Sequence, residues 1–136
     1  MSGPADDVRD RLVLAAREAC RRAYAPYSRF PVGAALLGED GEIYSGCNIE
    51  NASFGLTLCA ERAAVCQAVS RGCRRFEAVA IYTPTPELKS LCGACRQVLS
   101  EFSPRMRVFS ACDGPGRNEA LLCDLLPGAF DLRAGE

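Results

Sequence analysis

The sequence predicts an α/β fold in which helices pack against a central mixed sheet. Apolar residues recur at helical spacing near the N-terminus, two strand-like runs flank the turn residues 38–41, and strand-like and helical segments alternate after residue 56. The alternation indicates a layered α/β protein, and the tight turn pairs the first two strands antiparallel, so the sheet should be mixed. A length of 136 residues suits one domain, which we expect to span residues 1–136.

The first half of the chain should contain a helix, an ordered loop and a hairpin. Apolar side chains recur at helical spacing over residues 5–23. The arginines of this segment are interleaved with acidic residues, which favours a solvated helix face over a nucleic-acid surface. Two prolines make residues 25–31 an ordered loop, and strands are expected at residues 32–37 and 42–48.

The second half should alternate helices and strands. A loop through residues 51–55 leads into the next helix, and prolines make residues 83–90 irregular. The expected elements are a helix near 58–70, a strand at 75–83, a helix at 93–102, a strand at 107–111 and a short element near 121–126.

The charge balance and the absence of histidine exclude several classes of function. Sixteen basic and 17 acidic residues give a net charge of −1, which argues against a nucleic-acid partner bound through phosphates. Without histidine there is no Ser-His-Asp or Cys-His catalytic group. No apolar run reaches 18 residues and the N-terminus does not resemble a signal peptide, so we expect a cytoplasmic protein without a membrane partner.

The nine cysteines of such a chain should be reduced thiols or metal ligands rather than disulfides. Two segments, Cys59-Ala60-Glu61-Arg62 and Cys92-Gly93-Ala94-Cys95, fall where helices should begin, and a helix N-terminus stabilises a thiolate. Cys92 and Cys95 can turn toward one point, where Cys59 would add a third sulfur. Three thiolates leave one open position on a tetrahedral zinc ion, which is typical of a catalytic site. The remaining cysteines should serve as small hydrophobic residues.

Glu61 and Arg62 stand out because the helix around them is otherwise almost wholly apolar, and charges at the start of a buried helix need partners. Glu61 is placed to exchange protons with water at the open position, and Arg62 to offset the charge of the thiolates. On these residues alone, a closed structural zinc site, a pair of buried thiols and a redox pair at Cys92 and Cys95 all stay open. Cys66 lies two helical turns from Cys59, about 10 Å away, which is too far to complete the site.

Further motifs make the chain resemble the small, three-cysteine, homotetrameric cytidine deaminases. The wider deaminase signature, His-x-Glu followed by Pro-Cys-x-x-Cys, occurs here with Cys59 in place of histidine. Residues 27–35, 48–52 and 125–130 also match the family, so the resemblance spans nearly the whole chain. It implies a three-layer α/β/α fold with about five strands, and a homotetramer with one zinc ion per chain. The implied reaction is the deamination of cytidine and 2′-deoxycytidine in pyrimidine salvage.

The resemblance also implies a role for each matching residue. Cys59, Cys92 and Cys95 would bind zinc, Glu61 would shuttle protons, and Arg62 would hydrogen-bond the ligand thiolates. The residues implied to contact substrate are Phe30 and the N–H of Ala60 at the base, Asn48 and Glu50 at the ribose, and Phe130 from a neighbouring subunit.

The chain departs from the family pattern at Leu91, where the motif has proline. Leucine has a larger, freer side chain and a less constrained φ, so we expect zinc binding to survive and the fit around C4 and C5 of the base to change. Two alternatives follow: a deaminase of a modified or antibiotic cytosine nucleoside and, more remotely, a non-catalytic structural zinc module. A nucleotide deaminase would need a phosphate clamp, for which Arg29 is the only arginine we can nominate.

Overall fold

The structure, a computed structural model, describes residues 4–132 and contains one five-stranded mixed sheet with the strand order β2-β1-β3-β4-β5. β1 pairs antiparallel with β2 and β3, β3 pairs parallel with β4, and β4 pairs antiparallel with β5. The mixed sheet predicted from the sequence is therefore confirmed. The strands are β1 (Gly33–Gly38), β2 (Ile43–Cys47), β3 (Phe76–Thr83), β4 (Arg107–Cys112) and β5 (Arg117–Leu121).

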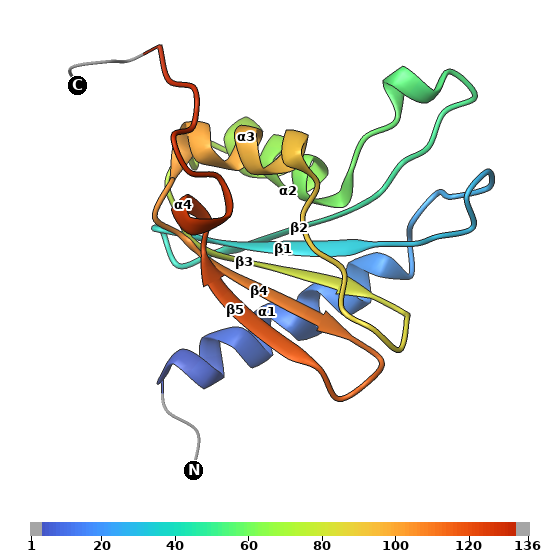
Figure 1. Cartoon of the computed structure of the whole chain (residues 1–136), viewed down its shortest axis with the longest axis horizontal. Coiled ribbons are helices and arrows are strands. Elements are labelled where there is room, and N and C mark those ends of the chain that lie inside the picture. The colour runs from blue at the N-terminus through green and yellow to red at the C-terminus, as the bar shows by residue number, and fades with distance from the viewer. Residues whose placement is uncertain (1–3, 133–136) are drawn as a thin grey trace.

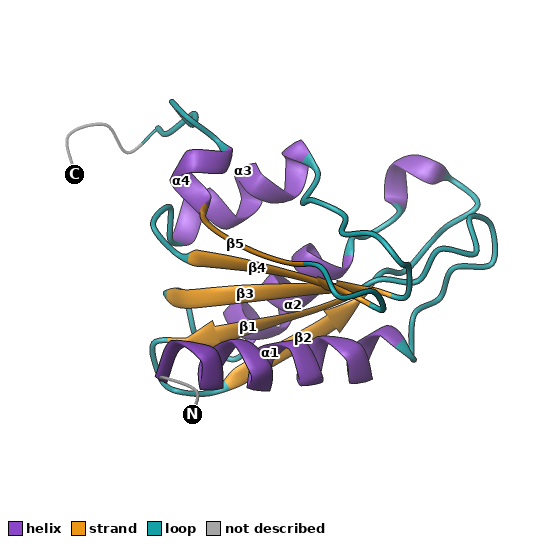
Figure 2. Ribbon diagram, turned by 60° about the horizontal axis from the view of Figure 1, so that its bottom comes forward, coloured by secondary structure: helices purple, strands orange, loops and turns teal. Residues whose placement is uncertain are grey.

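Helices cover both faces of the sheet and make three layers. α1 (Pro4–Cys20) packs on one face; α2 (Ala60–Ser70), α3 (Gly93–Phe102) and the short α4 (Leu122–Leu125) pack on the other (Figures 1 and 2). β1 is fully buried, and its side chains point alternately into the hydrophobic cores on the two faces of the sheet. Ala34 and Leu36 face the layer of α2 and α3, whereas Ala35 and Leu37 face α1.

Two glycines let the helices approach the sheet closely. A Cβ at Gly33 would lie 1.8 Å from the carbonyl oxygen of Ala16 in α1, and a Cβ at Gly46 would lie 2.5 Å from the amide nitrogen of Ala64 in α2. Neither position has room for a larger residue, because the obstructing atoms are backbone. Gly46 therefore sets the distance between α2 and the end of the sheet where the helix begins.

The elements differ from the sequence prediction mainly at their ends. α3 has the predicted bounds, but α1 ends at Cys20 rather than at residue 23. The chain leaves the helix because Tyr24 pairs with the segment after β2: its N–H donates to Asn48 O at 3.0 Å, and its carbonyl accepts from Glu50 N–H at 2.8 Å. The sequence analysis had no strand at β5, an edge strand whose first three residues, Arg117, Asn118 and Glu119, are polar and exposed.

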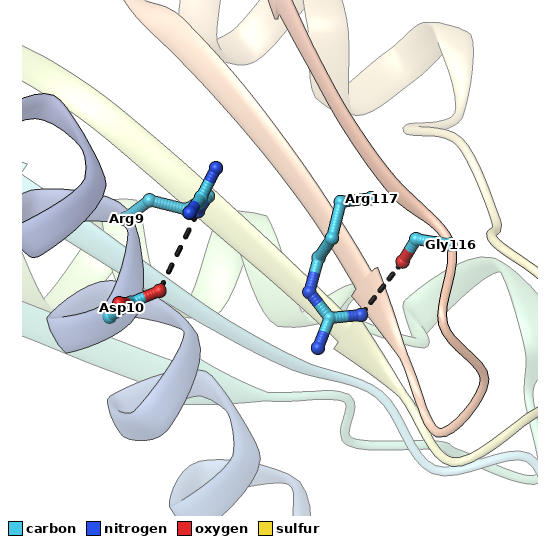
Figure 3. A network of polar contacts seen from close by, with 4 residues as sticks. All are labelled: Arg9, Asp10, Gly116 and Arg117. Atoms are coloured by element: carbon cyan, nitrogen blue, oxygen red, sulfur yellow. Dashed lines mark hydrogen bonds and ion pairs between the residues drawn. The ribbon is translucent and has the colours of Figure 1, made fainter. Parts of the chain in front are cut away.

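Surface arginines make local contacts on α1 and at the β4–β5 turn. Arg9 Nε lies 3.6 Å from Asp10 Oδ1, and Arg21 Nη1 lies 3.5 Å from Glu18 Oε1, as the interleaving of charges along α1 suggested. Arg117 Nη1 donates to the carbonyl of Gly116 at 2.7 Å and fastens the turn into β5 (Figure 3). Among residues 4–132, no helix combines the length and apolarity that crossing a membrane requires.

Candidate metal centre and substrate pocket

The antiparallel pairing of β1 with both β2 and β3 brings three strand ends to one end of the sheet. The start of β1, the end of β2 and the end of β3 all lie there, and α2 and α3 begin nearby. The loops that follow α1 and β2 also extend beyond this end of the sheet (Figure 1). Leu58 is tied to Ile49 by a pair of backbone hydrogen bonds of 2.9 Å, which fixes the entry into α2.

The three predicted ligand cysteines occupy the first turns of these two helices. Cys59 is the N-cap of α2 and Cys92 is the N-cap of α3. Cys95 lies in the first turn of α3, and its N–H donates to Cys92 Sγ at 3.3 Å. Cys92 Sγ thus accepts an N–H group that has no acceptor within the helix, whereas Cys59 Sγ accepts no N–H group of α2. At both positions the helix dipole favours the ionised form of the sulfur. Both helix starts are therefore suited to thiolates.

The three sulfurs form a compact donor set that fits zinc. They lie within 4.8 Å of one another, and the sulfurs of Cys92 and Cys95 are 3.1 Å apart. Sulfurs at about 2.3 Å from one tetrahedral zinc would be separated by about 3.8 Å, so a small adjustment accommodates the ion. No other group of three or more potential ligands of this kind occurs among the described residues. Within residues 4–132 no fourth ligand joins the group, so a tetrahedral ion held there would keep one coordination position for water or substrate.

Charge compensation at the site comes from Arg62. Its Nη2 donates to Thr57 O at 3.3 Å and to Cys59 Sγ at 3.5 Å. Its Nε is buried and has no hydrogen-bond partner within the described part of the chain. Hydrogen bonds from the Cys95 thiol and from Arg62 lower the pKa of Cys59 to about 5, whereas the hydrogen bond to Cys59 and burial raise the pKa of Cys95. The Cys59 sulfur is therefore ionised at neutral pH.

A cavity of about 200 Å³ opens beside the sulfurs. Of the residues predicted from the sequence, six line it: Phe30, Asn48, Cys59, Ala60, Glu61 and Cys92. Ala60 is the first residue of α2, so its N–H has no acceptor within the helix and is free for a ligand. The cavity thus has a thiolate, a carboxylate and a free backbone N–H on its wall.

Glu61 is the buried acid of the cavity. It is only 6% exposed. Burial, together with the negative charge of Cys59, raises the pKa of its carboxyl group. A carboxyl group with a raised pKa exchanges protons more readily near neutral pH than an exposed one, which is the property of a general acid–base.

Asn48 and Glu50 both hold the loop that carries Phe30. Asn48 Oδ1 accepts from Val32 N–H at 2.9 Å, and its Nδ2 donates to Phe30 O at 2.9 Å. Glu50 accepts from the N–H groups of Tyr27 and Ser28 at 2.9 and 3.1 Å, and from the Ser28 hydroxyl. Glu50 does not line the cavity of Glu61; it lines an adjoining hollow that shares Thr57 with it.

Phe130 lies away from the cavity of its own chain. Its ring is 69% exposed, and its carbonyl accepts from Gln97 Nε2 on α3 at 3.0 Å. The structure therefore brings together the predicted ligands and Glu61, with Arg62 beside Cys59, but it does not bring Phe130 to them.

The sequence analysis assigned no site role to six residues that also line the cavity: Val32, Thr57, Ile81, Thr83, Lys89 and Ser90. Lys89 is the only lysine of the chain, and it lies three positions before Cys92. Its closeness to a predicted ligand could have indicated that it lies near the site. Leu91 was expected to alter the fit around the base. Its side chain is 4% exposed, packs into the core between the sheet and α3, and is absent from the cavity wall.

Comparison with known proteins gives a consistent result. Residues 7–111 match the family model described as the cytidine and deoxycytidylate deaminase zinc-binding region. The chain is 49% identical over 122 residues to a cytidine deaminase of Sporosarcina psychrophila, covering 89% of this chain and 90% of that protein. It is 48% identical over 117 residues to a cytidine deaminase of Mycobacterium tuberculosis, covering 86% and 85%.

Solved structures show the same likeness. A crystal structure of cytidine deaminase from Burkholderia pseudomallei superposes with a TM-score of 0.85 at 44% identity, covering 89% of this chain and 98% of that one. A crystal structure of cytidine deaminase from Mycobacterium tuberculosis gives a TM-score of 0.78 at 46% identity, covering 90% and 97%. The three-layer arrangement predicted for the sheet and helices is thereby confirmed.

Proposed function

The chain belongs to the cytidine deaminase family, and we propose that it hydrolyses the 4-amino group of cytidine and 2′-deoxycytidine, giving the uridines and ammonia. The observation that carries the proposal is the position of Glu61. This buried carboxyl group lines the same cavity as Cys59 and Cys92, two residues along α2 from Cys59. A structural zinc site has no need of a cavity with an acid in its wall.

Each residue of the cavity then has a chemical task. Cys59, Cys92 and Cys95 would hold the zinc ion, which when bound would supply the Lewis acidity that makes water a nucleophile near neutral pH. Glu61 takes a proton from the attacking water and delivers it to ring nitrogen N3 as C4 becomes tetrahedral. Glu61 then carries the proton of the new C4 hydroxyl to the amino nitrogen, and the C4–N bond breaks as the C4 carbonyl forms, which releases ammonia.

The residues that would orient the nucleoside lie before β1, after β2 and at the start of α2. The free N–H of Ala60 is suited to the pyrimidine O2, and Phe30 offers its ring to the base. Asn48 already bonds Val32 and Phe30, yet an amide retains one further N–H and one lone pair for a ribose hydroxyl. The Glu50 carboxylate likewise retains lone pairs beyond the three bonds from Tyr27 and Ser28, so it can share a hydroxyl from the sugar.

The alternative of a modified or antibiotic nucleoside gains no support from Leu91, because its side chain lies in the core and not in the cavity. A nucleotide substrate would need a set of phosphate donors. Lys89 is the only cationic side chain on the wall of the cavity among residues 4–132, and one flexible ammonium is a poor clamp. We therefore assign the unphosphorylated nucleosides.

We also propose that the chain works as a homotetramer in the cytoplasm. Several large apolar side chains are more than half exposed, among them Phe54, Leu56 and Phe130 at 76%, 71% and 69%, and self-association would cover them. Phe130 would then complete the cavity of a neighbouring subunit, since it lies outside its own. All nine cysteines are free thiols, which suits a reducing compartment.

The first test is turnover measured beside zinc content on one sample. We expect about one zinc per chain and ammonia release from cytidine and 2′-deoxycytidine, with little from CMP or free cytosine. The variant Glu61→Gln should keep zinc and fold while turnover falls by about 10²- to 10⁴-fold. Full zinc with no nucleoside turnover in the unmodified chain would contradict the substrate assignment, and full turnover in Glu61→Gln would contradict the proton-transfer role.

A further inference from the structure

We propose that Arg96 is a positioning residue that fixes the Ser90–Leu91 segment, of which Ser90 lines the substrate cavity, and joins this segment to the C-terminal segment 125–130. The inference rests on the proposed function, because Ser90 lines the cavity that would bind cytidine. Arg96 follows the ligand Cys95 directly on α3, and the sequence motifs assigned it no role.

Three hydrogen bonds from one guanidinium carry the inference. Arg96 Nε donates to the carbonyl of Leu91 at 3.1 Å, and Nη2 donates to the hydroxyl of Ser90 at 2.7 Å. Nη1 donates to the carbonyl of Leu125 at 2.8 Å. A guanidinium is a rigid plane with its N–H groups in fixed directions, so one side chain sets the relative positions of all three oxygens. A flexible ammonium could not do so.

The Ser90–Leu91 segment needs such a restraint because it lies in irregular chain. Residues 84–92 between β3 and α3 form no helix or strand, yet Ser90 lines the cavity and Cys92 is a ligand. Leu91 lacks the ring with which a proline would restrict φ. Its position is instead set at two points: the buried side chain in the core and the carbonyl held by Arg96. The Ser90 hydroxyl accepts from Arg96, which leaves its own proton free to donate.

The same helix turn also holds the other end of the C-terminal segment. Gln97, next to Arg96, donates from Nε2 to the carbonyl of Phe130 at 3.0 Å, so two adjacent side chains bracket residues 125–130. If α3 or the Ser90–Leu91 segment moves, these hydrogen bonds should move residues 125–130, which include Phe130, in the same direction. Arg96 donates hydrogen bonds to both segments.

The test compares Arg96→Met, Arg96→Lys and the control Val98→Ala, a partly buried core residue of the same helix that contacts neither segment through hydrogen bonds. In both Arg96 variants we expect full zinc content, kcat lower by about 10- to 100-fold, and a smaller change in KM, because the base is displaced relative to Glu61. Hydrogen exchange should rise at residues 89–92 and 126–130 and stay unchanged in the sheet. Val98→Ala should lower the melting temperature without these changes.

A double-mutant cycle separates positioning from a general loss of stability. If Arg96 restrains the Leu91 backbone, Leu91→Pro should restore part of kcat in Arg96→Met while doing little in the unmodified chain. Purely additive effects, or unchanged exchange at residues 89–92 in folded Arg96→Met, would overturn the proposal. Should Arg96→Met not fold, the cycle of Ser90→Ala with Arg96→Lys decides, since additive losses would again contradict it. Hydrogen exchange can be measured even if the unmodified chain does not turn over cytidine. The exchange result therefore tests the role of Arg96, and the turnover result tests the proposed function.

Discussion

Glu50 joins the ribose site to the loop that bears Phe30, and this makes its carboxylate sensitive to acid. The hydrogen bond from the Ser28 hydroxyl, followed by those from the N–H groups of Ser28 and Tyr27, lowers the pKa of Glu50 below its usual value. A group with a depressed pKa in the folded state contributes stability above its unfolded pKa of about 4.3, and that contribution is lost as pH falls through the folded value.

We therefore predict that Glu50→Gln is less stable than the unmodified chain at neutral pH and that the difference narrows as the pH is lowered below about 4. Urea unfolding of both chains over this pH range measures it. Glu119→Gln, at an exposed residue of β5, is the matched control for the loss of one carboxylate charge. A stability difference that stays constant with pH would show that the Glu50 hydrogen bonds are not held by the ionised form.

At the scale of elements, the sequence predicted what local pattern determines. The ligands Cys59, Cys92 and Cys95 could be placed together because each lies in the first turn of a recognisable helix, and Glu61 follows from the same turn. β5 could not be predicted, because a polar edge strand has no alternation of apolar residues. Ile81 and Thr83 were missed because their place on the cavity wall depends on the pairing of β3 with β1 and β4, which involves residues far apart in the chain. Ser90 was missed because it lies in irregular chain, where no local pattern indicates which way a side chain points.

The approach of α2 to β2 gives a prediction at this scale. A Cβ at Gly46 would meet backbone atoms of Ala64 and Ala60 at 2.5 and 2.7 Å, so Gly46→Ala must push the start of α2 away from the sheet. We expect a loss of about 1–3 kcal/mol in the free energy of unfolding and a lower kcat, because Cys59 and Glu61 move with the helix. Gly55→Ala, where a Cβ meets nothing within 4 Å, is the control. Unchanged stability and turnover in Gly46→Ala would mean that α2 can move away from β2 without cost, which would contradict the prediction.

At the scale of the whole molecule, the position of Phe130 distinguishes a self-sufficient chain from a shared site. Its ring is exposed beyond α3 while its backbone is held by Gln97, so it is fixed in a place from which its own cavity gains nothing. If Phe130 serves a neighbouring subunit, Phe130→Ala should raise KM for cytidine severalfold and leave zinc content and the fold of each chain intact.

Complementation tests this sharing directly. Phe130→Ala chains carry an intact Glu61, and Glu61→Gln chains carry an intact Phe130, so a mixed oligomer contains sites in which one chain supplies each residue. With the two chains co-expressed at equal levels and assembled at random, about a quarter of the sites regain both groups. Activity at low cytidine concentration should then exceed the average of the two variants measured alone, because a quarter of the sites are fully active and the sites that lack only Phe130 add their own turnover. A mixture no more active than the average of its two components would place Phe130 outside any shared site, and an active monomer would exclude the tetramer itself.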